Sequence, residues 1–259
     1  MEYIDTGKCI WCKLEKPVVS FGKKPHIIPH ALNANYIGTD ICNKCNTFFG
    51  TSTSNKPSVD LVFKEVFNAF RFFGQKLTIN SYKTFKSVYF KYEHSKNIIT
   101  VKNSFLTTTL TRQFKRGLFE IFLQYYHDQT HGGNNPIFDP IRDFARYDKG
   151  NLRVYYLKAD YILKPVREED MFVLPMSEVA IAEVFSLGIY RFHFFGHFFY
   201  LEIIPELFNI NSKKYFQEQT ELLVKAPNLM GEIIELTDIL EVDMFMQRFH
   251  KRKICFKTS

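Results

Sequence analysis

Two pairs of cysteines near the N-terminus constrain this chain more than any other feature of its sequence. Cys9 and Cys12 form one C-x-x-C pair, and Cys42 and Cys45 form the second. Each pair can present two thiolates to one ion from a tight turn, as a tetrahedral structural zinc site requires. A disulfide framework is the alternative, but the chain is long and its N-terminal segment lacks the apolar stretch of a signal peptide. The four cysteines therefore predict one structural Zn²⁺, and Cys255 is predicted to be a free thiol.

The segment between the two pairs is unusually long. Residues 13–41 separate them, which is more than the roughly 15 to 20 residues of a simple zinc ribbon. The segment carries the apolar runs Val18-Val19 and Ile27-Ile28, each followed closely by Gly or Pro, which indicates two short strands and a turn. A short helix can begin at Asn46, directly after Cys45. We expect a β-β-α unit that is held together by one zinc ion.

The rest of the chain predicts a mixture of helices and strands. Residues 51–57 are polar and turn-forming, so we expect a boundary between a zinc-stabilised unit over 1–56 and a larger α+β domain over 57–259. Apolar spacing predicts helices over 58–73, with Ser58 as N-cap, and over 107–126, 139–147 and 238–248. Residues 77–101 predict two or three strands, and mostly strands are expected from Leu152 onward, with a hairpin around Gly196. The predicted fold class is α+β.

The composition is that of a folded protein. Hydrophobic residues make up 46% of the chain and charged residues 24%, which excludes wholesale disorder. No uncharged apolar run of about 18 residues occurs, so no membrane span and no membrane partner are predicted. Together with the N-terminal segment, this predicts a cytoplasmic protein.

Positive charge is concentrated in two segments. The net charge is +7; residues 76–116 carry nine Lys or Arg against one acid, and residues 244–259 carry five and no acid. Such a distribution favours a polyanion partner, with nucleic acid as the expected one. The alternative is that these lysines only solvate a strand surface. The residues predicted to contact phosphate are Lys83, Lys86, Lys91, Arg112, Lys115, Arg116, Lys251, Arg252 and Lys253.

Residues 8–50 carry a more specific pattern. After the first C-x-x-C pair comes Lys-Lys-x-His-Ile-Ile-Pro over 23–29, and the second pair is followed directly by Asn-x-x-Phe-Gly over 46–50. In order, spacing and residue type, this pattern resembles the HNH nuclease superfamily, the ββα-metal endonucleases with a treble-clef zinc site. More narrowly, it resembles a bacterial HNH group with His-Ile-Ile-Pro and Cys-x-x-Cys-Asn motifs.

The resemblance implies roles for particular residues. His26 would be the general base, because a neutral imidazole can take a proton from the water that attacks a phosphodiester. Asn46 would hold a catalytic Mg²⁺ or Mn²⁺ through its amide oxygen. The Zn²⁺ on the four cysteines would be structural. Either Asn33 or Asn35 would orient the loop that carries the base.

One departure from the HNH pattern concerns the catalytic metal. Many HNH nucleases have Asp or Glu directly before the base as a second metal ligand, whereas this chain has Pro25. His30 and Asp40 are the nearby candidates to assist. His127 and His131 have the spacing of a helical metal pair, but no acid follows at the spacing of a zincin, so we do not assign them as ligands.

Three functions are compatible with these features. The first is a metal-dependent HNH endonuclease that cuts DNA. The second is a zinc-dependent nucleic-acid-binding module with a degenerate active site, which Pro25 favours. The third is a nuclease gated by residues 57–259, acting as a sensor or as a docking domain for a partner. By resemblance, two-part HNH proteins serve bacterial defence against phage, which implies a homodimer or another protein of a defence system as a further partner.

Overall fold

The structure, a computed structural model, describes residues 2–32, 36–74, 87–93, 95–96, 98–102, 107–159, 172–194, 196–225, 231–243 and 255–258. Its helices are η1 (His30–Leu32), α1 (Asn43–Gly50), α2 (Val59–Gly74), α4 (Thr107–Thr130), η2 (Pro136–Phe138), α5 (Asp139–Ala145), α6 (Glu178–Leu187), α7 (Pro205–Lys225) and η4 (Ile239–Glu241). Its strands are β1 (Phe90–Glu93), β2 (Ile98–Val101), β3 (Val154–Ala159), β4 (Phe172–Val173), β5 (Ile189–Phe194), β6 (His197–Glu202), β7 (Gly231–Glu235) and β8 (Cys255–Thr258). The predicted α+β class is confirmed.

The strands form two sheets. The larger sheet has the order β4-β5-β6-β3-β7, and each strand is antiparallel to its neighbours. β5 and β6 form the hairpin predicted around Gly196, with Phe194 paired to His197. Gly196 has a φ of 81°, which glycine adopts at no steric cost. The smaller sheet has the order β1-β2-β8, in which β8 runs parallel to β2.

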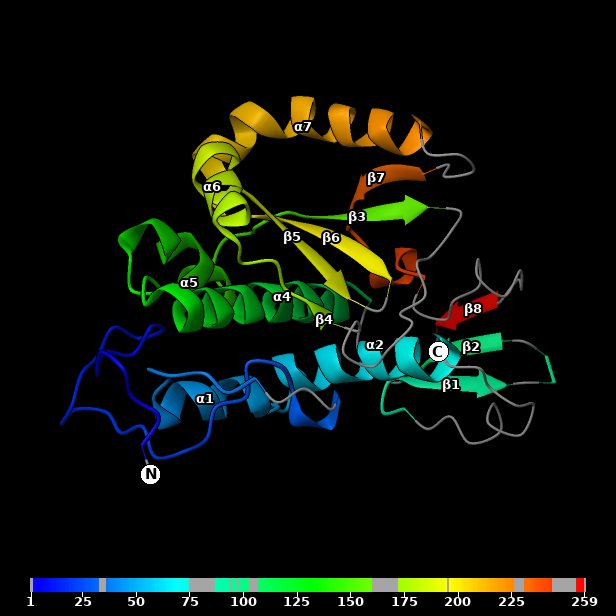
Figure 1. Cartoon of the computed structure of the whole chain (residues 1–259). Helices are drawn as coiled ribbons and strands as arrows, with labels where there is room; N and C mark the ends of the chain where they lie inside the picture. The colour runs from blue at the N-terminus through cyan, green and yellow to red at the C-terminus, as the bar shows by residue number, and fades with distance from the viewer. Residues whose placement is uncertain are drawn as a thin grey trace.

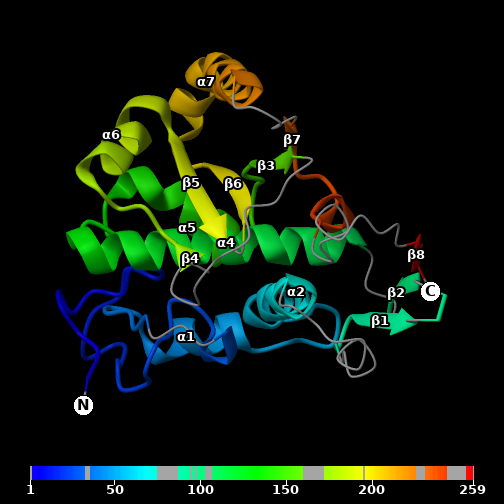
Figure 2. The same cartoon turned by 45° about the vertical axis from the view of Figure 1, so that its right-hand side comes forward.

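The five-stranded sheet lies between two layers of helix (Figure 1, Figure 2). α7 covers one face, where Phe208 packs with Leu157 and Tyr200 of the sheet. α4 lies along the other face, and the rings of Phe114 in α4 and Phe199 in β6 are 5.6 Å apart. α2 and the N-terminal unit lie on the far side of α4 (Figure 2). α4 is therefore the middle layer of the molecule.

The position of α4 explains its burial. The sequence predicts a helix with one apolar side, yet every residue from Gln113 to Gln124 is buried. A helix packed on two sides has no face left for water, so its polar groups need internal partners. Arg116 donates from Nε and Nη2 to the Ala145 carbonyl at 3.0 and 2.8 Å, and Gln124 donates to Glu120 at 2.9 Å.

Gly117 sets how closely α2 approaches α4. A Cβ at this position would lie 2.9 Å from Cδ2 and 3.3 Å from Cβ of Phe63, which is itself fully buried on α2. Only glycine leaves room for this contact. Phe63 in turn stacks on Phe114 at 5.7 Å. The two helices therefore pack through an aromatic seam that depends on one missing side chain.

Several predicted elements are confirmed. The helices expected over 58–73, 107–126 and 139–147 correspond to α2, α4 and α5. Ser58 caps α2, because its Oγ accepts the backbone N–H of Leu61 at 3.2 Å. Within the region expected to be strand, β1 and β2 are present, whereas residues 75–86 lie outside the described residues.

Other expectations were wrong. α6 and α7 occupy a region that we expected to be mostly strand. Local signals for both helices are present: Ser177 and Gly188 cap α6, and Pro205 starts α7. We expected strands because the aromatic runs that form β5 and β6 lie between these two helices in the sequence. Of the helix expected over 238–248, the structure describes only η4, and residues 244–250 lie outside the described part.

The N-terminal unit shares its core with the rest of the chain. One hydrophobic cluster includes Cys9 and Trp11 of the N-terminal unit together with Val242. Arg142 of α5 donates to the Ile10 carbonyl at 2.6 Å. The loop between α1 and α2 coincides with the boundary expected over 51–57, and the elements on its two sides pack against each other. None of the helices in the described ranges is long and apolar enough to cross a membrane.

Replacing Gly117 with Val tests the α2–α4 seam. The added atoms would overlap Phe63, so we expect the free energy of unfolding to fall by about 1–3 kcal/mol, or more if the ring cannot move. Chemical denaturation with urea measures this change. Valine has a higher helix propensity than glycine, so propensity alone would stabilise this variant. Ala182→Val, at an exposed position of α6, shows the small effect of valine where nothing overlaps it. An unchanged or higher free energy of unfolding in the Gly117 variant would show that the seam is not tight.

Candidate metal centre and catalytic site

The four N-terminal cysteines come together in the structure. One thiol sulfur from each of Cys9, Cys12, Cys42 and Cys45 lies within 4.8 Å of the others. The sulfurs of Cys12 and Cys42 are 3.8 Å apart, far beyond the about 2.05 Å of a disulfide. A zinc ion with four sulfurs at about 2.3 Å defines a tetrahedron with edges of about 3.8 Å. The cluster therefore fits a metal ion such as zinc.

Neighbouring groups support these sulfurs. The backbone N–H of Cys42 donates to Cys9 Sγ, and Nε of Arg146 donates to Cys45 Sγ, both at 3.4 Å. Hydrogen bonds from Cys45 and Cys9 lower the pKa of the Cys12 thiol, whereas the bonds to Cys12, together with burial, raise the pKa of Cys9 and Cys45. Four thiolates around a divalent cation carry excess negative charge, which the Arg146 guanidinium offsets. No signal in the sequence pointed to Arg146, because it lies about a hundred residues from the cysteines.

Asp40 organises the N-terminal segment around this centre. Its carboxylate is fully buried and accepts the backbone N–H groups of Asp5, Thr6 and Gly7, the Thr6 hydroxyl, and Nε2 of His127. Burial alone would raise the pKa of Asp40, but these hydrogen bonds outweigh it, and the pKa is lowered. The expectation that Asp40 assists the catalytic metal was wrong, because both of its oxygens are already engaged.

His127 is a structural partner of Asp40. Its Nδ1 accepts the backbone N–H of Gly133 at 3.1 Å, so the proton of a neutral ring is on Nε2, which donates to Asp40 at 3.2 Å. A Cβ at Gly133 would lie 2.5 Å from Cβ of His127, so glycine is required for this approach. Although Asp5, Asp40 and His127 lie close together, neither ring nitrogen of His127 is left for a metal. His131 bonds to Asp5 instead, so the two histidines do not converge.

The residue predicted to be the general base lies on a backbone hairpin. His26 forms an antiparallel bridge with Ile37, flanked by hydrogen bonds from Ile27 N–H to Tyr36 O and from Gly38 N–H to Pro25 O, both 3.0 Å. The connection between the two arms includes Asn33 and Asn35, which lie outside the described residues. In the described part of this segment, the bridge between His26 and Ile37 stands in place of the two expected strands. The hairpin leads directly into the second cysteine pair and α1.

Asn46 lies beside this hairpin on α1. Its Nδ2 donates to the carbonyl of Lys24 at 3.4 Å, two residues before His26. α1 begins at Asn43, not at Asn46 as expected, so Cys45 and Asn46 are already helical. Asn43 joins helix to hairpin: its Oδ1 accepts Lys23 N–H at 2.8 Å and its Nδ2 donates to Ser20 Oγ at 2.9 Å. The sequence did not predict this role of Asn43, because the residue lies between the two cysteines of the second C-x-x-C pair.

The surroundings of His26 favour its neutral form. Burial, followed by the nearby charges of His30 and Lys24, lowers the pKa of His26 below its ordinary value near 6.5. Its Nδ1 is buried and has no hydrogen-bond partner among the described residues. The ring of His30, which is exposed, lies 5.2 Å from that of His26. His26 can therefore accept a proton at neutral pH.

The basic residues predicted to grip nucleic acid are not gathered on one surface in the described part of the chain. Lys115 and Arg116 are 6% and 2% exposed inside α4, so neither lies on an open surface of the described chain. Arg112 is partly buried and bonds to Asp148 at 2.6 Å. Lys91 is exposed on β1, 3.4 Å from Glu93. Lys83, Lys86, Lys251, Arg252 and Lys253 lie outside the described residues.

No protein-family model, curated protein or solved structure matches this chain in the comparisons with known proteins. The geometry of the site is therefore what bears on its chemistry. The site combines a cysteine centre able to hold zinc with a hairpin that carries His26 and a helix that carries Asn46. The hydrogen bond from Asn46 to Lys24 joins this helix to the hairpin.

Substitution of Cys12 by Ser tests the metal centre. With one sulfur lost, we expect the purified protein to lose about one equivalent of zinc per chain, and its melting temperature to fall. Elemental analysis together with a thermal melt measures both quantities. Cys255→Ser, a cysteine outside the cluster, is the control and should keep the full zinc content. Unchanged zinc in the Cys12 variant would refute the four-cysteine site.

Substitution of Asp40 by Asn tests the clamp on the N-terminal segment. The amide would turn donor groups toward buried N–H donors, and each unpaired buried group costs about 1–3 kcal/mol. We expect a loss of at least about 3 kcal/mol in the free energy of unfolding, measured with urea. Asp143→Asn, at an exposed position of α5, should be within about 0.5 kcal/mol of wild type. A small effect at Asp40 would mean that the segment is held by other contacts.

Proposed function

We propose that this protein is a metal-dependent endonuclease of the HNH type that hydrolyses phosphodiester bonds in DNA. The observation that supports the proposal is the hydrogen bond from Asn46 Nδ2 to Lys24 O. It brings the asparagine implied as metal ligand next to the hairpin that carries the histidine implied as base. Both lie on the unit that the cysteine cluster joins, in the order hairpin, second cysteine pair, helix.

The side chains have complementary roles in this proposal. His26 is neutral at physiological pH and accepts the proton of the attacking water. The amide nitrogen of Asn46 is used by Lys24 O, which leaves its Oδ1 to face a cation. A bound Mg²⁺ or Mn²⁺ would polarise the scissile phosphate and offset charge on the leaving oxygen. With one neutral protein ligand, phosphate and water would complete the coordination, so activity is expected to depend on added metal.

The zinc has a structural role in this proposal. The unit has little regular structure of its own between its cysteine pairs, where the described residues form the His26–Ile37 bridge, one arm of the Lys8–Glu15 bridge and one short 3₁₀ turn. Structural zinc sites contribute on the order of 10 kcal/mol to folding in small units of this kind. A zinc ion on the four cysteines would therefore hold the hairpin against α1.

A second candidate function rests on Pro25. This residue stands where many HNH nucleases have an acidic metal ligand, and here it is buried and its carbonyl accepts Gly38 N–H. It serves the hairpin and offers no carboxylate. A zinc-dependent nucleic-acid-binding module with a degenerate active site is compatible with this feature. Such a module would bind DNA without cutting it at any metal concentration.

Residues after the linker contact the N-terminal unit. α4 and α5 contact the N-terminal unit through the bonds of His127 to Asp40, Arg142 to Ile10 and Arg146 to Cys45. This supports a nuclease gated by residues 57–259, through a sensed ligand or a docked partner. A bacterial defence role, cytoplasmic location, and assembly as a homodimer or with another defence protein belong to this proposal.

Cleavage of supercoiled plasmid by the full chain tests the proposal. We expect nicking or linearisation with Mg²⁺ or Mn²⁺ that stops when the metal is chelated. His26→Ala should lower the rate by about 10²–10⁴-fold, the usual contribution of a general base. Asn46→Ala should raise the metal concentration needed for activity, whereas Asn46→Asp should keep it, because a carboxylate can also bind the ion.

Controls separate loss of catalysis from loss of structure. His131→Ala removes an exposed histidine outside the hairpin and should cut at the wild-type rate. Zinc content and melting temperature should be unchanged in the His26 and Asn46 variants. Equal cutting by wild type and His26→Ala would contradict the assignment of the base. DNA binding without cutting by any form would favour the binding module.

A further inference from the structure

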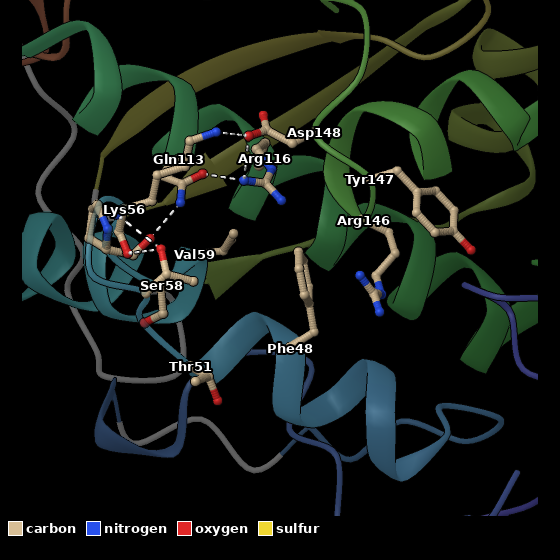
Figure 3. A pocket seen from close by; sticks show the side chains of 12 residues that line it. Phe48, Thr51, Lys56, Ser58, Val59, Gln113, Arg116, Arg146, Tyr147 and Asp148 are labelled. Carbon is tan, nitrogen blue, oxygen red and sulfur yellow. Dashed lines mark hydrogen bonds and ion pairs between the residues drawn. The ribbon is translucent and has the colours of Figure 1, made fainter.

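A cavity of about 240 Å³ lies on the other side of α1 from the proposed catalytic site. It opens between the end of α1, the linker to α2, and the residues that follow α5 (Figure 3). Phe48 lines it, whereas Asn46 bonds to the hairpin; two residues along a helix point about 200° apart. The cavity is therefore separate from the site of His26 and Asn46.

Three cationic side chains line this cavity. They are Lys56 from the linker, Arg116 from α4 and Arg146 from the end of α5, and Asp148 is the one lining residue with a carboxylate. Asp148 is engaged by Lys56 and by Arg112, which donates from Nε at 2.6 Å. The charge of Asp148 is therefore already compensated by Lys56, which lines the cavity, and by Arg112, which does not. The lining as a whole has an excess of positive charge.

Arg116 is a buried cation with donors to spare. Its side chain is 3% exposed, and its hydrogen bonds go to the Ala145 carbonyl, from Nε and Nη2, and to Gln113, from Nη1. A guanidinium has five N–H groups, so two have no hydrogen-bond acceptor among the described residues. Asp148 lies 3.7 Å away, too far for a hydrogen bond. A buried cation in this state favours an anionic ligand.

Arg146 adds a second guanidinium beside an aromatic surface. It stacks over the ring of Phe48 at 3.8 Å and donates from Nε to Cys45. Its four terminal N–H groups have no hydrogen-bond acceptor in the described part of the chain. Tyr147, 45% exposed, lies at the edge of the cavity (Figure 3). Planar guanidinium groups bind tetrahedral oxyanions through paired hydrogen bonds.

The N-terminus of α2 also favours an anionic ligand in the cavity. Ser58 and Val59, at the start of this 16-residue helix, also line the cavity. The first-turn N–H groups and the helix dipole favour negative charge there. This contribution adds to the two guanidinium groups and does not replace them.

From these contacts we propose that the cavity binds the phosphate group of a small ligand, such as a nucleoside monophosphate, or of a nucleic-acid end. Arg116, Arg146 and Lys56 hold the phosphate, and Tyr147 offers a ring on which an attached base can stack. The volume is below the about 300–1,000 Å³ of pockets for drug-sized molecules, so the ligand is one phosphate with a small group attached. The ligand also ties α1 to α4 and α5 through Phe48 and Arg146.

Calorimetric titration of the full, zinc-loaded chain tests this proposal. The probes are inorganic phosphate, adenosine monophosphate, adenosine, and short oligonucleotides with and without a 5′-phosphate. We expect binding of the phosphate-bearing probes and none of adenosine or the unphosphorylated oligonucleotide. Arg146→Gln and Lys56→Gln should each weaken binding by about tenfold or more, since each removes a charged donor. Lys214→Gln, an exposed lysine on α7, should bind as wild type does.

The outcomes separate the possible sources of the phosphate. Binding of adenosine monophosphate assigns a free small molecule, and binding of the 5′-phosphorylated oligonucleotide alone assigns a nucleic-acid end. Lys56→Gln changes only an exposed side chain, so it remains informative if an arginine variant loses zinc or fails to fold. Absence of binding by every phosphate-bearing probe, or equal affinity in the Lys56 and Arg146 variants and wild type, would overturn the proposal. Neither result depends on whether His26 supports cleavage.

Discussion

The burial of α4 on both sides is the constraint on which the rest of this structure depends. A helix between a sheet and a second helical layer has no solvated face, so its polar side chains must find partners inside the protein. Gln113 donates to the carbonyl of Pro57, Arg116 to that of Ala145, and His127 to Asp40. Each of these bonds reaches a segment outside α4. These hydrogen bonds satisfy the buried polar groups of α4. They also position the linker, the end of α5 and the N-terminal segment.

The N-terminal unit is joined to this framework by hydrogen bonds. Between its cysteine pairs the described residues have little regular structure, and their order comes from side-chain bonds: Asp40 gathers the N–H groups of residues 5–7, and Asn43 joins α1 to the hairpin. A metal ion on the four cysteines would lock the same arrangement at its centre. Arg142 and Arg146 then connect that centre to α5. The candidate catalytic residues, His26 and Asn46, are therefore positioned by contacts that extend far beyond the motif that carries them.

α1 links the two sites proposed for this protein. One side of the helix carries Asn46 beside the hairpin, and another side carries Phe48 under the guanidinium of Arg146. Arg146 touches both the cysteine cluster and the phosphate-binding cavity that we propose. A ligand in that cavity would act on the same helix that positions the proposed metal ligand. This arrangement gives the larger part of the chain a physical route to influence the N-terminal unit.

The sequence by itself determined what depends on near neighbours. Closely spaced cysteines predict a metal cluster, Ser58 predicts a helix start, and the turn at Gly196 predicts a hairpin, because each follows from a few consecutive residues. The tertiary structure alone decided what depends on distant ones. Charge alone predicted that Lys115 and Arg116 contact nucleic acid, but both are buried in α4, and of the two only Arg116 lines the cavity. Asp40 meets His127 across 87 residues, and the phosphate cavity draws its cations from three separate elements. No local pattern encodes such contacts, because long-range packing sets which side of a helix is buried and which charges meet.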